Sequence, residues 1–90
     1  MRTPEYSSQF KRDYKKMKSR GKNIAIMKAA MELLLMGKTL PEAYKDHQLK
    51  GEWNLFRELH LESDWLLVYR VAENTVYFTR TGTHADIFNK

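Results

Sequence analysis

The chain has no cysteine among its 90 residues, and this absence excludes several classes of protein. Without thiols there is no disulfide scaffold, no thiolate zinc site and no cysteine nucleophile. No apolar run approaches the roughly 18–20 residues of a membrane span, and the N-terminal segment lacks the apolar core of a signal peptide. No glycine-rich phosphate loop and no GxSxG motif occur. The length predicts a single domain over residues 1–90, and we expect the protein in the cytoplasm.

Positive charge is concentrated in the first part of the chain. Residues 1–38 hold ten Lys or Arg against three Asp or Glu, whereas residues 39–90 hold six against eight, and the net charge is +5. A basic segment of this kind favours a polyanionic partner such as RNA, DNA or an acidic protein. The alternative is a solvated helix face that has no partner.

The first 20 residues predict a short strand over 3–7 and then a helix over 9–20. Ser8 is the expected N-cap of this helix, and Gly21 ends it because glycine accepts the left-handed conformation of a C-cap. Basic residues cover the surface outside an apolar stripe of i, i+4, i+7 spacing. The stripe consists of Phe10, Tyr14 and Met17.

A second helix is expected over 24–36, with Asn23 as its N-cap. Its apolar positions surround most of the circumference, so we expect it to be largely buried. The two helices would form an αα-hairpin with one basic outer surface. Residues 38–51 read as a connection, in which Pro41 starts a single helical turn.

Three strands and a short helix are expected in the remainder. The runs 53–61, 65–72 and 75–80 alternate or are rich in β-branched and aromatic residues, and the second is apolar nearly throughout, as in a central strand. In the first run one face would carry Trp53, Leu55, Leu59 and Leu61. A short helix over 83–88 would follow. The predicted fold is α+β, with an N-terminal strand and an αα-hairpin packed on an antiparallel sheet of three to four strands.

All three histidines lie near turns or strand ends of this predicted sheet. A meander would bring five residues to one edge of the sheet: His60, Asp64, Trp65, Arg80 and His84. Taken singly, each histidine is more often a surface or hydrogen-bonded residue, but their convergence beside Arg and Asp indicates a site.

Such a cluster suits cleavage of RNA by the adjacent 2′-OH, which needs no covalent nucleophile. The reaction requires a base for the 2′ proton, an acid for the 5′ oxygen and cationic donors for the phosphoryl charge. Histidine serves as either acid or base near neutral pH, and Arg80 offers a planar fork for phosphate. Trp65 and Phe88 could stack on unpaired bases, although core packing is the ordinary alternative.

A metal site is the competing use of three histidines. The separations of 13 and 24 residues match no compact ligand motif. We therefore expect neither a metal nor another cofactor.

At these residues the chain resembles a known family. DHQLKG at 46–51, HLESDW at 60–65 and RTGTHA at 80–85 stand in the order and spacing of the YafQ-type toxins of the RelE/ParE superfamily, which belong to type II toxin–antitoxin systems. The resemblance spans residues 44–88 and implies a RelE-like fold. It also implies an mRNA interferase, an endonuclease that cleaves mRNA codons in the ribosomal A site.

The resemblance implies roles for individual residues as well. His84 would be the general acid, His60 or Asp64 the base, His47 a group for proton transfer or phosphate contact, and Arg80 the cation for phosphate charge. Substrate contacts would come from Trp65 and Phe88, and rRNA contacts from the basic helix, including Lys15, Lys16 and Lys18.

The implied partners are mRNA on the ribosome and a cognate antitoxin, with operator DNA bound only through the antitoxin complex. No membrane partner is implied. Two alternatives stay open, a ParE-like inhibitor of DNA gyrase and a non-catalytic RNA-binding domain.

Overall fold

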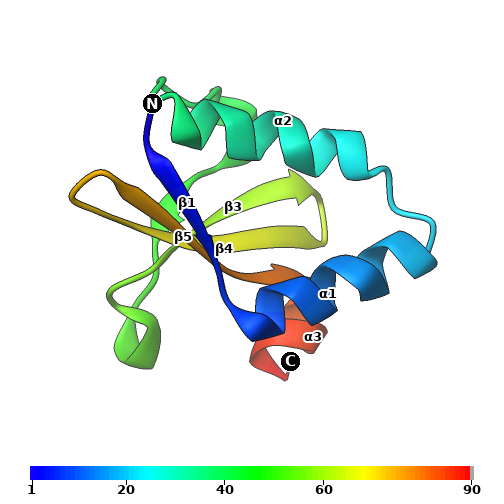
Figure 1. Ribbon diagram of the computed structural model, residues 1–90. Coiled ribbons are helices and arrows are strands. Elements are labelled where there is room, and N and C mark those ends of the chain that lie inside the picture. The colour runs from blue at the N-terminus through cyan, green and yellow to red at the C-terminus, as the bar shows by residue number, and fades with distance from the viewer. Residues whose placement is uncertain (90) are drawn as a thin grey trace.

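The computed structural model describes residues 1–89 and is built on a five-stranded sheet (Figure 1). The elements follow in the order β1 (Thr3–Tyr6), α1 (Ser8–Ser19), α2 (Ile24–Leu35), the 3₁₀ turn η1 (Glu42–Tyr44), β2 (His47–Gln48), the 3₁₀ turn η2 (Gly51–Trp53), β3 (Arg57–Glu62), β4 (Trp65–Ala72), β5 (Thr75–Gly82) and α3 (His84–Phe88). The strand order is β1-β5-β4-β3-β2. β1 pairs with β5 in parallel and the other pairs are antiparallel. The α+β class and the C-terminal helix are confirmed, and the sheet has one strand more than the predicted maximum.

β4 is the central strand, as its apolar sequence predicts. Trp65, Leu67 and Tyr69 point to the face that carries α1 and α2, whereas Leu66 and Val68 point to the opposite face. All five side chains are buried. Because burial of one such aliphatic or aromatic side chain stabilises a fold by about 1.5–3 kcal/mol, this strand anchors both layers of the core.

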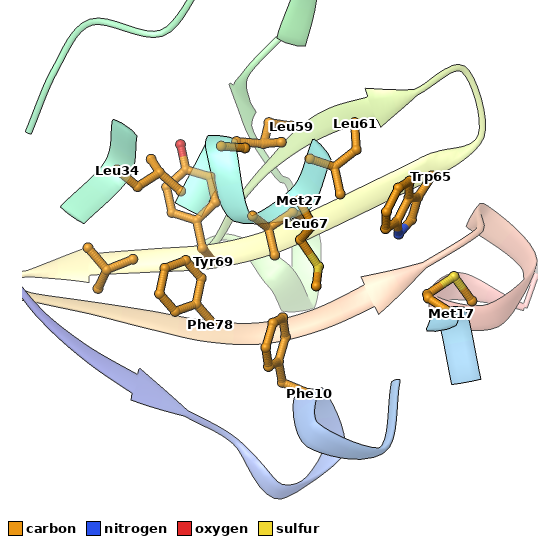
Figure 2. Close-up of a cluster of buried hydrophobic side chains, with 12 residues drawn as sticks. Phe10, Met17, Met27, Leu34, Leu59, Leu61, Trp65, Leu67, Tyr69 and Phe78 are labelled. Carbon is orange, nitrogen blue, oxygen red and sulfur yellow. The ribbon is translucent and has the colours of Figure 1, made fainter. Parts of the chain in front are cut away.

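α1 and α2 pack on the same face of the sheet, joined by the short connection over residues 20–23 (Figure 1). Figure 2 shows their buried side chains meeting the sheet residues; Phe10, Met17, Met27 and Leu34 come from the helices. α2 is less buried than expected, since only Met27, Ala30 and Leu34 are buried in it. α2 covers the sheet from outside, so that only one stripe of its side chains contacts the core. In the described residues no helix is long and apolar enough to cross a membrane.

The helix boundaries are set by identifiable caps. The N-cap of α1 is Ser7 and not the predicted Ser8, because Ser7 is the residue whose Oγ accepts from the Phe10 N–H, at 2.9 Å. Asn23 caps α2 as predicted and accepts from the Ala25 N–H at 3.1 Å. Gly21 follows α1 with φ +84°, the left-handed conformation expected of it.

Residues 53–56 do not belong to a strand, contrary to the alternation in the sequence. Gly51 has φ +66° and begins the turn η2, and the Gln48 side chain donates to the Asn54 carbonyl at 2.7 Å. Trp53 consequently packs on the face opposite α1 and α2, away from Leu59 and Leu61, and Leu55 is exposed. The strand pattern holds from Arg57 onward.

Candidate active site

A row of paired residues crosses four strands on the face opposite α1 and α2, and it explains how distant residues meet. The backbone register aligns His47 of β2 with Glu58 of β3, Glu58 with Val68 of β4, and Val68 with Arg80 of β5. Neighbouring strands lie about 4.8 Å apart, and paired residues point to the same face. His60 follows two positions after Glu58 and shares this face. We call His47, Glu58, Val68 and Arg80 the cross-strand row.

Glu58 is a buried carboxylate between two histidines. Its side chain is 6% exposed, and its Oε2 lies 3.4 Å from His47 Nε2 and 3.9 Å from His60 Nε2. The two imidazole rings have centroids 6.1 Å apart. The sequence prediction omitted Glu58 from the site, although its position two residues before His60 was the available signal.

His84 is held by Asp64 at the far side of this cluster. Asp64 Oδ1 accepts from the His84 backbone N–H at 3.0 Å and lies 2.7 Å from His84 Nδ1. These hydrogen bonds lower the pKa of Asp64 below its usual range, and the bond from the His84 backbone has the largest effect. The ionised carboxylate keeps the ring proton on Nδ1 of neutral His84, which leaves Nε2 for another partner. The His84 and His60 rings have centroids 6.0 Å apart.

His47 is fixed by the loop that precedes it. Its Nδ1 lies 2.8 Å from the Lys45 carbonyl. Asp46 is tied to the sheet, because it accepts from the Arg57 Nε and Nη2 at 3.1 and 2.8 Å and from the Tyr69 hydroxyl. Burial raises the pKa of Tyr69 well above its usual value, so the phenol stays a donor. A cavity of about 500 Å³ lies beside this loop, and its lining residues include Asp46, Arg57 and Tyr69 but none of the histidines.

Arg80 ends the cross-strand row and is paired with a residue of α1. Its Nε donates to Asp13 Oδ2 at 2.7 Å, and its Nη2 donates to the Asp86 carbonyl at 3.3 Å. Its side chain is 20% exposed. Arg80 therefore shares one face of the sheet with His47 and His60, and the residues expected to converge are spread across neighbouring strands of that face.

The expected role of Trp65 in base stacking disagrees with the structure. Trp65 is fully buried on the α1–α2 side (Figure 2). Its Nε1 donates to Thr81 Oγ1 at 3.0 Å. β4 alternates in orientation, so Trp65 points away from the histidines. Its counterpart on the side of the histidines is Trp53, which is half-buried and packs edge-on against Phe88 with ring centroids 5.4 Å apart.

Trp53 and Phe88 belong to a cleft of about 300 Å³ next to the histidines. The cleft is lined by Leu49, Lys50, Trp53, Glu58, His84 and Phe88. It combines two partly exposed aromatic rings, one cation and one of the histidines, a composition that accommodates an unpaired base. The sequence prediction placed Phe88 here and missed Trp53, which it assigned to a strand.

The basic helix lies nearer to the site than its sequence position suggests. Lys16 and Arg20 contact Asp86 of α3 at 3.3 and 2.7 Å. Chiefly through the Arg20 hydrogen bond, the pKa of Asp86 lies well below its usual range. Lys15 and Lys18 are exposed. Of the three lysines expected to contact rRNA, Lys16 therefore also supports the helix that carries His84.

The site includes donors that could hold a metal ion. Glu58, His60 and His84 each offer one ligand atom, and these atoms lie within 4.8 Å of one another. Two nitrogens and one carboxylate oxygen suit first-row transition metals such as Zn²⁺ or Cu²⁺. The spacing of the histidines in the sequence does not reveal this set of ligands, because β3 and the start of α3 are brought together only when the chain folds.

Comparisons with known proteins agree on one family. The family model described as "Bacterial toxin of type II toxin-antitoxin system, YafQ" matches residues 2–89. The mRNA interferase toxin YafQ of Escherichia coli strain K12 is 42% identical over 85 residues, which cover 93% of this chain and 92% of that protein.

Two groups of solved structures match across nearly the whole chain. The E. coli DinJ–YafQ complex contains a chain with TM-score 0.91 and 42% identity, covering 98% of this chain and 99% of that one. A metal-bound toxin from Helicobacter pylori has TM-score 0.91 and 38% identity, covering 98% and 100%. The fold and the sequence thus point to the same relatives.

Proposed function

The chain belongs to the YafQ family of bacterial toxins of type II toxin–antitoxin systems, and from this premise we propose that it is an mRNA interferase that cleaves codons in the ribosomal A site. Its similarity to the E. coli mRNA interferase toxin supports the endoribonuclease activity. The DinJ–YafQ complex supports a cognate antitoxin as a partner. Residues 1–90 form one toxin domain that acts in the cytoplasm.

The observation that carries this proposal is the pair of histidines that face each other across the cluster. His84, with Asp64 on its Nδ1, and His60, beside Glu58, have ring centroids 6.0 Å apart. In an in-line displacement the attacking and leaving oxygens lie on opposite sides of phosphorus. An acid and a base on separate rings meet this requirement.

In the proposed reaction His60 removes the proton from the 2′-OH, and the 2′ oxygen attacks the adjacent phosphorus. The bond from phosphorus to the 5′ oxygen breaks, and His84 donates its proton to that oxygen. The products are a 2′,3′-cyclic phosphate and a 5′-OH. Arg80 stabilises the charge on the phosphoryl oxygens, and His47 assists through phosphate contact or proton transfer.

Asp64 acts in this scheme by orienting His84 and not as the base. Its Oδ1 already accepts two hydrogen bonds from His84. Either histidine tautomer would be possible for a free ring, but the carboxylate selects the one with a proton on Nδ1. His84 must then be doubly protonated to act as the acid, and the Asp64 carboxylate stabilises that cation.

Substrate binding is divided between two surfaces. The cleft beside Trp53 and Phe88 takes an unpaired base by stacking. The exposed lysines of α1, such as Lys15 and Lys18, contact the phosphate backbone of rRNA. No step requires a metal ion, although Glu58, His60 and His84 could bind one.

The test is cleavage of a defined mRNA on purified ribosomes, with the ends of the products analysed chemically. We expect cleavage only with ribosomes, a 5′-OH on the downstream fragment, and the same rate from protein that was treated with EDTA and dialysed before it was added to the ribosomes. His84→Gln should lose activity, whereas Glu62→Gln, an exposed carboxylate on β3, should retain it. Cleavage that leaves a 5′-phosphate, or that is lost with the EDTA-treated protein and restored by Zn²⁺, would refute the mechanism. Absence of cleavage by the unaltered protein would refute the function.

A further inference from the structure

One edge of β5 is covered in two different ways along its length. β1 pairs with Thr75–Phe78 and then ends, and in the described part of the chain no strand pairs with the rest of that edge. α1 and its N-cap cover the remaining part of this edge of β5. The Ser7 hydroxyl donates to the Thr79 carbonyl at 2.7 Å, and the Thr81 N–H donates to Asp13 Oδ2 at 3.2 Å. Figure 1 shows α1 beside β5 and α3.

Asp13 is the one carboxylate of α1, and it is buried. It is 4% exposed on a helix whose other charged residues are cations. Its Oδ2 accepts from Arg80 Nε at 2.7 Å, and its Oδ1 accepts from Gln9 Nε2 at 2.9 Å and from Arg80 Nη2 at 3.4 Å. A buried charge is costly unless it is paired and hydrogen-bonded, and this one meets both conditions.

Within residues 1–89, these contacts leave one nitrogen of Arg80 without a protein partner. Nε and Nη2 donate hydrogen bonds to Asp13, and Nη2 also donates to the Asp86 carbonyl. Nη1 has no acceptor among the described residues, and the side chain is 20% exposed. A guanidinium fixed on one side has its remaining donors preorganised for phosphate, with less side-chain freedom to lose on binding.

We propose that Asp13 is a positioning residue for Arg80: its buried carboxylate holds the guanidinium at the end of the cross-strand row so that Nη1 meets the scissile phosphate. This inference rests on the proposed function, in which Arg80 stabilises the phosphoryl charge. It assigns α1 a second role, because the helix that carries the rRNA-binding lysines also sets the geometry of a catalytic group.

The test is a double-mutant cycle on ribosome-dependent cleavage, with Asp13→Asn, Arg80→Ala and the double variant. Asp13→Asn keeps the size of the side chain and an acceptor for the Thr81 N–H but loses the charge that holds Arg80. We expect kcat to fall by between about 10-fold and 10²-fold, since a misplacement of about 1 Å can cost about 10²-fold, with little change in KM. In the Arg80→Ala background the same substitution should have no further effect on kcat.

A merely structural role would give a different pattern. If Asp13 only stabilised the fold, its replacement would reduce kcat by the same factor with and without Arg80, and that result would refute the proposal. A wild-type kcat for Asp13→Asn would refute it too. Glu32→Gln, an exposed carboxylate on α2, is the matched control and should leave kcat unchanged.

A second measurement covers the case in which Asp13→Asn does not fold. In the unaltered protein, the Arg80 Nε–H should give a slowly exchanging signal in a ¹⁵N–¹H NMR spectrum, assigned by its loss in Arg80→Lys. Rapid exchange of that signal would show that Asp13 does not hold the guanidinium. If the unaltered protein does not cleave mRNA, the proposed function fails, whereas cleavage with an unaffected Asp13→Asn variant contradicts only this inference.

Discussion

At the residue scale, the position of His84, the proposed acid, is set by a single turn. The short helix α3 begins at His84, with Thr83 as its cap, and Asp64 from the β3–β4 turn binds both the backbone and the ring of His84. The ring orientation is therefore set by two segments that lie 20 residues apart. Neither segment alone could fix it.

Asp64→Asn is expected to lower kcat by about 10-fold to 10²-fold. The amide keeps a hydrogen bond to His84 but loses the charge that orients the ring and stabilises it while it acts as the acid. His84→Ala should lose about 10²–10⁴-fold, the usual contribution of a positioned acid or base. Steady-state cleavage rates test both changes. A wild-type kcat for Asp64→Asn would contradict the role of Asp64.

The two tryptophans are expected to differ in what they affect. Trp65→Ala removes a buried ring and should lower the free energy of unfolding by about 3–5 kcal/mol. Trp53→Ala should leave most of the stability and raise KM, because its ring lines the cleft. Urea unfolding and cleavage kinetics on both variants make the comparison. If Trp65→Ala folds normally and raises KM alone, then Trp65 contacts the substrate after all.

The histidines, Asp64 and Arg80 could be selected from the sequence because strand ends and hairpins predict where side chains converge. Trp53 could not be placed because the turn at Gly51 starts the strand at Arg57 and not at Trp53. For Trp65 the bounds of the strand are as predicted, but a strand that is apolar on both faces does not show which side chains point toward the helices. Asp13 lies 67 residues from Arg80, so no local pattern could link the two.

At the element scale, α3 depends on ion pairs with α1. Asp86 lies in the capping box of α3 and accepts hydrogen bonds from Arg20, which is the main reason that its pKa is low. A five-residue helix forms few internal hydrogen bonds. Its position is therefore secured by the cap and by these cations.

The free energy of unfolding is expected to fall as the pH decreases from about 5 to about 2. The folded pKa of Asp86 lies below the unfolded value of about 3.9, so the unfolded state binds more protons in this range. The contribution is present above the unfolded pKa and is lost as the pH falls through the folded one. Asp86→Asn should give a shallower slope, with Glu52→Gln as the exposed control. Urea unfolding at several pH values measures it, and an equal slope would contradict the role of Asp86.

The exposed lysines of α1 are expected to govern ribosome affinity. Lys11, Lys15 and Lys18 changed together to Gln should weaken ribosome binding strongly at low salt and leave the cut positions unchanged. Lys16 is left intact here because it contacts Asp86. Binding is measured by sedimentation at two salt concentrations. A changed codon preference with unchanged affinity would assign these lysines to substrate reading.

At the scale of the whole molecule, the excess of positive charge lies in residues 1–38, which hold ten Lys or Arg against three Asp or Glu. The net charge is +5, and both RNA and an acidic peptide are attracted to such a surface. An antitoxin could therefore act by covering the site or by preventing contact with the ribosome. Both modes leave the catalytic residues unchanged.

Expression of the protein alone is expected to arrest growth, and co-expression with its antitoxin should restore it. We expect the antitoxin to be the product of the neighbouring upstream reading frame, with an acidic or amphipathic C-terminal segment. Growth curves and co-purification test this expectation. The His84→Ala variant should bind the same antitoxin without arresting growth, which separates binding from toxicity. If the neighbouring product neither binds nor restores growth, the predicted pairing is wrong.

The parallel pairing of β1 with β5 has a consequence for synthesis of the chain. Thr3 pairs with Thr75, and Asp13 forms its ion pair with Arg80. The N-terminal elements therefore lack these partners until β5 has been synthesised. Contacts of such long sequence separation form late because the intervening chain must first be closed into a loop. His84 follows β5. We therefore expect a nascent chain to assemble its candidate site only after β5 and His84 have emerged from the ribosome.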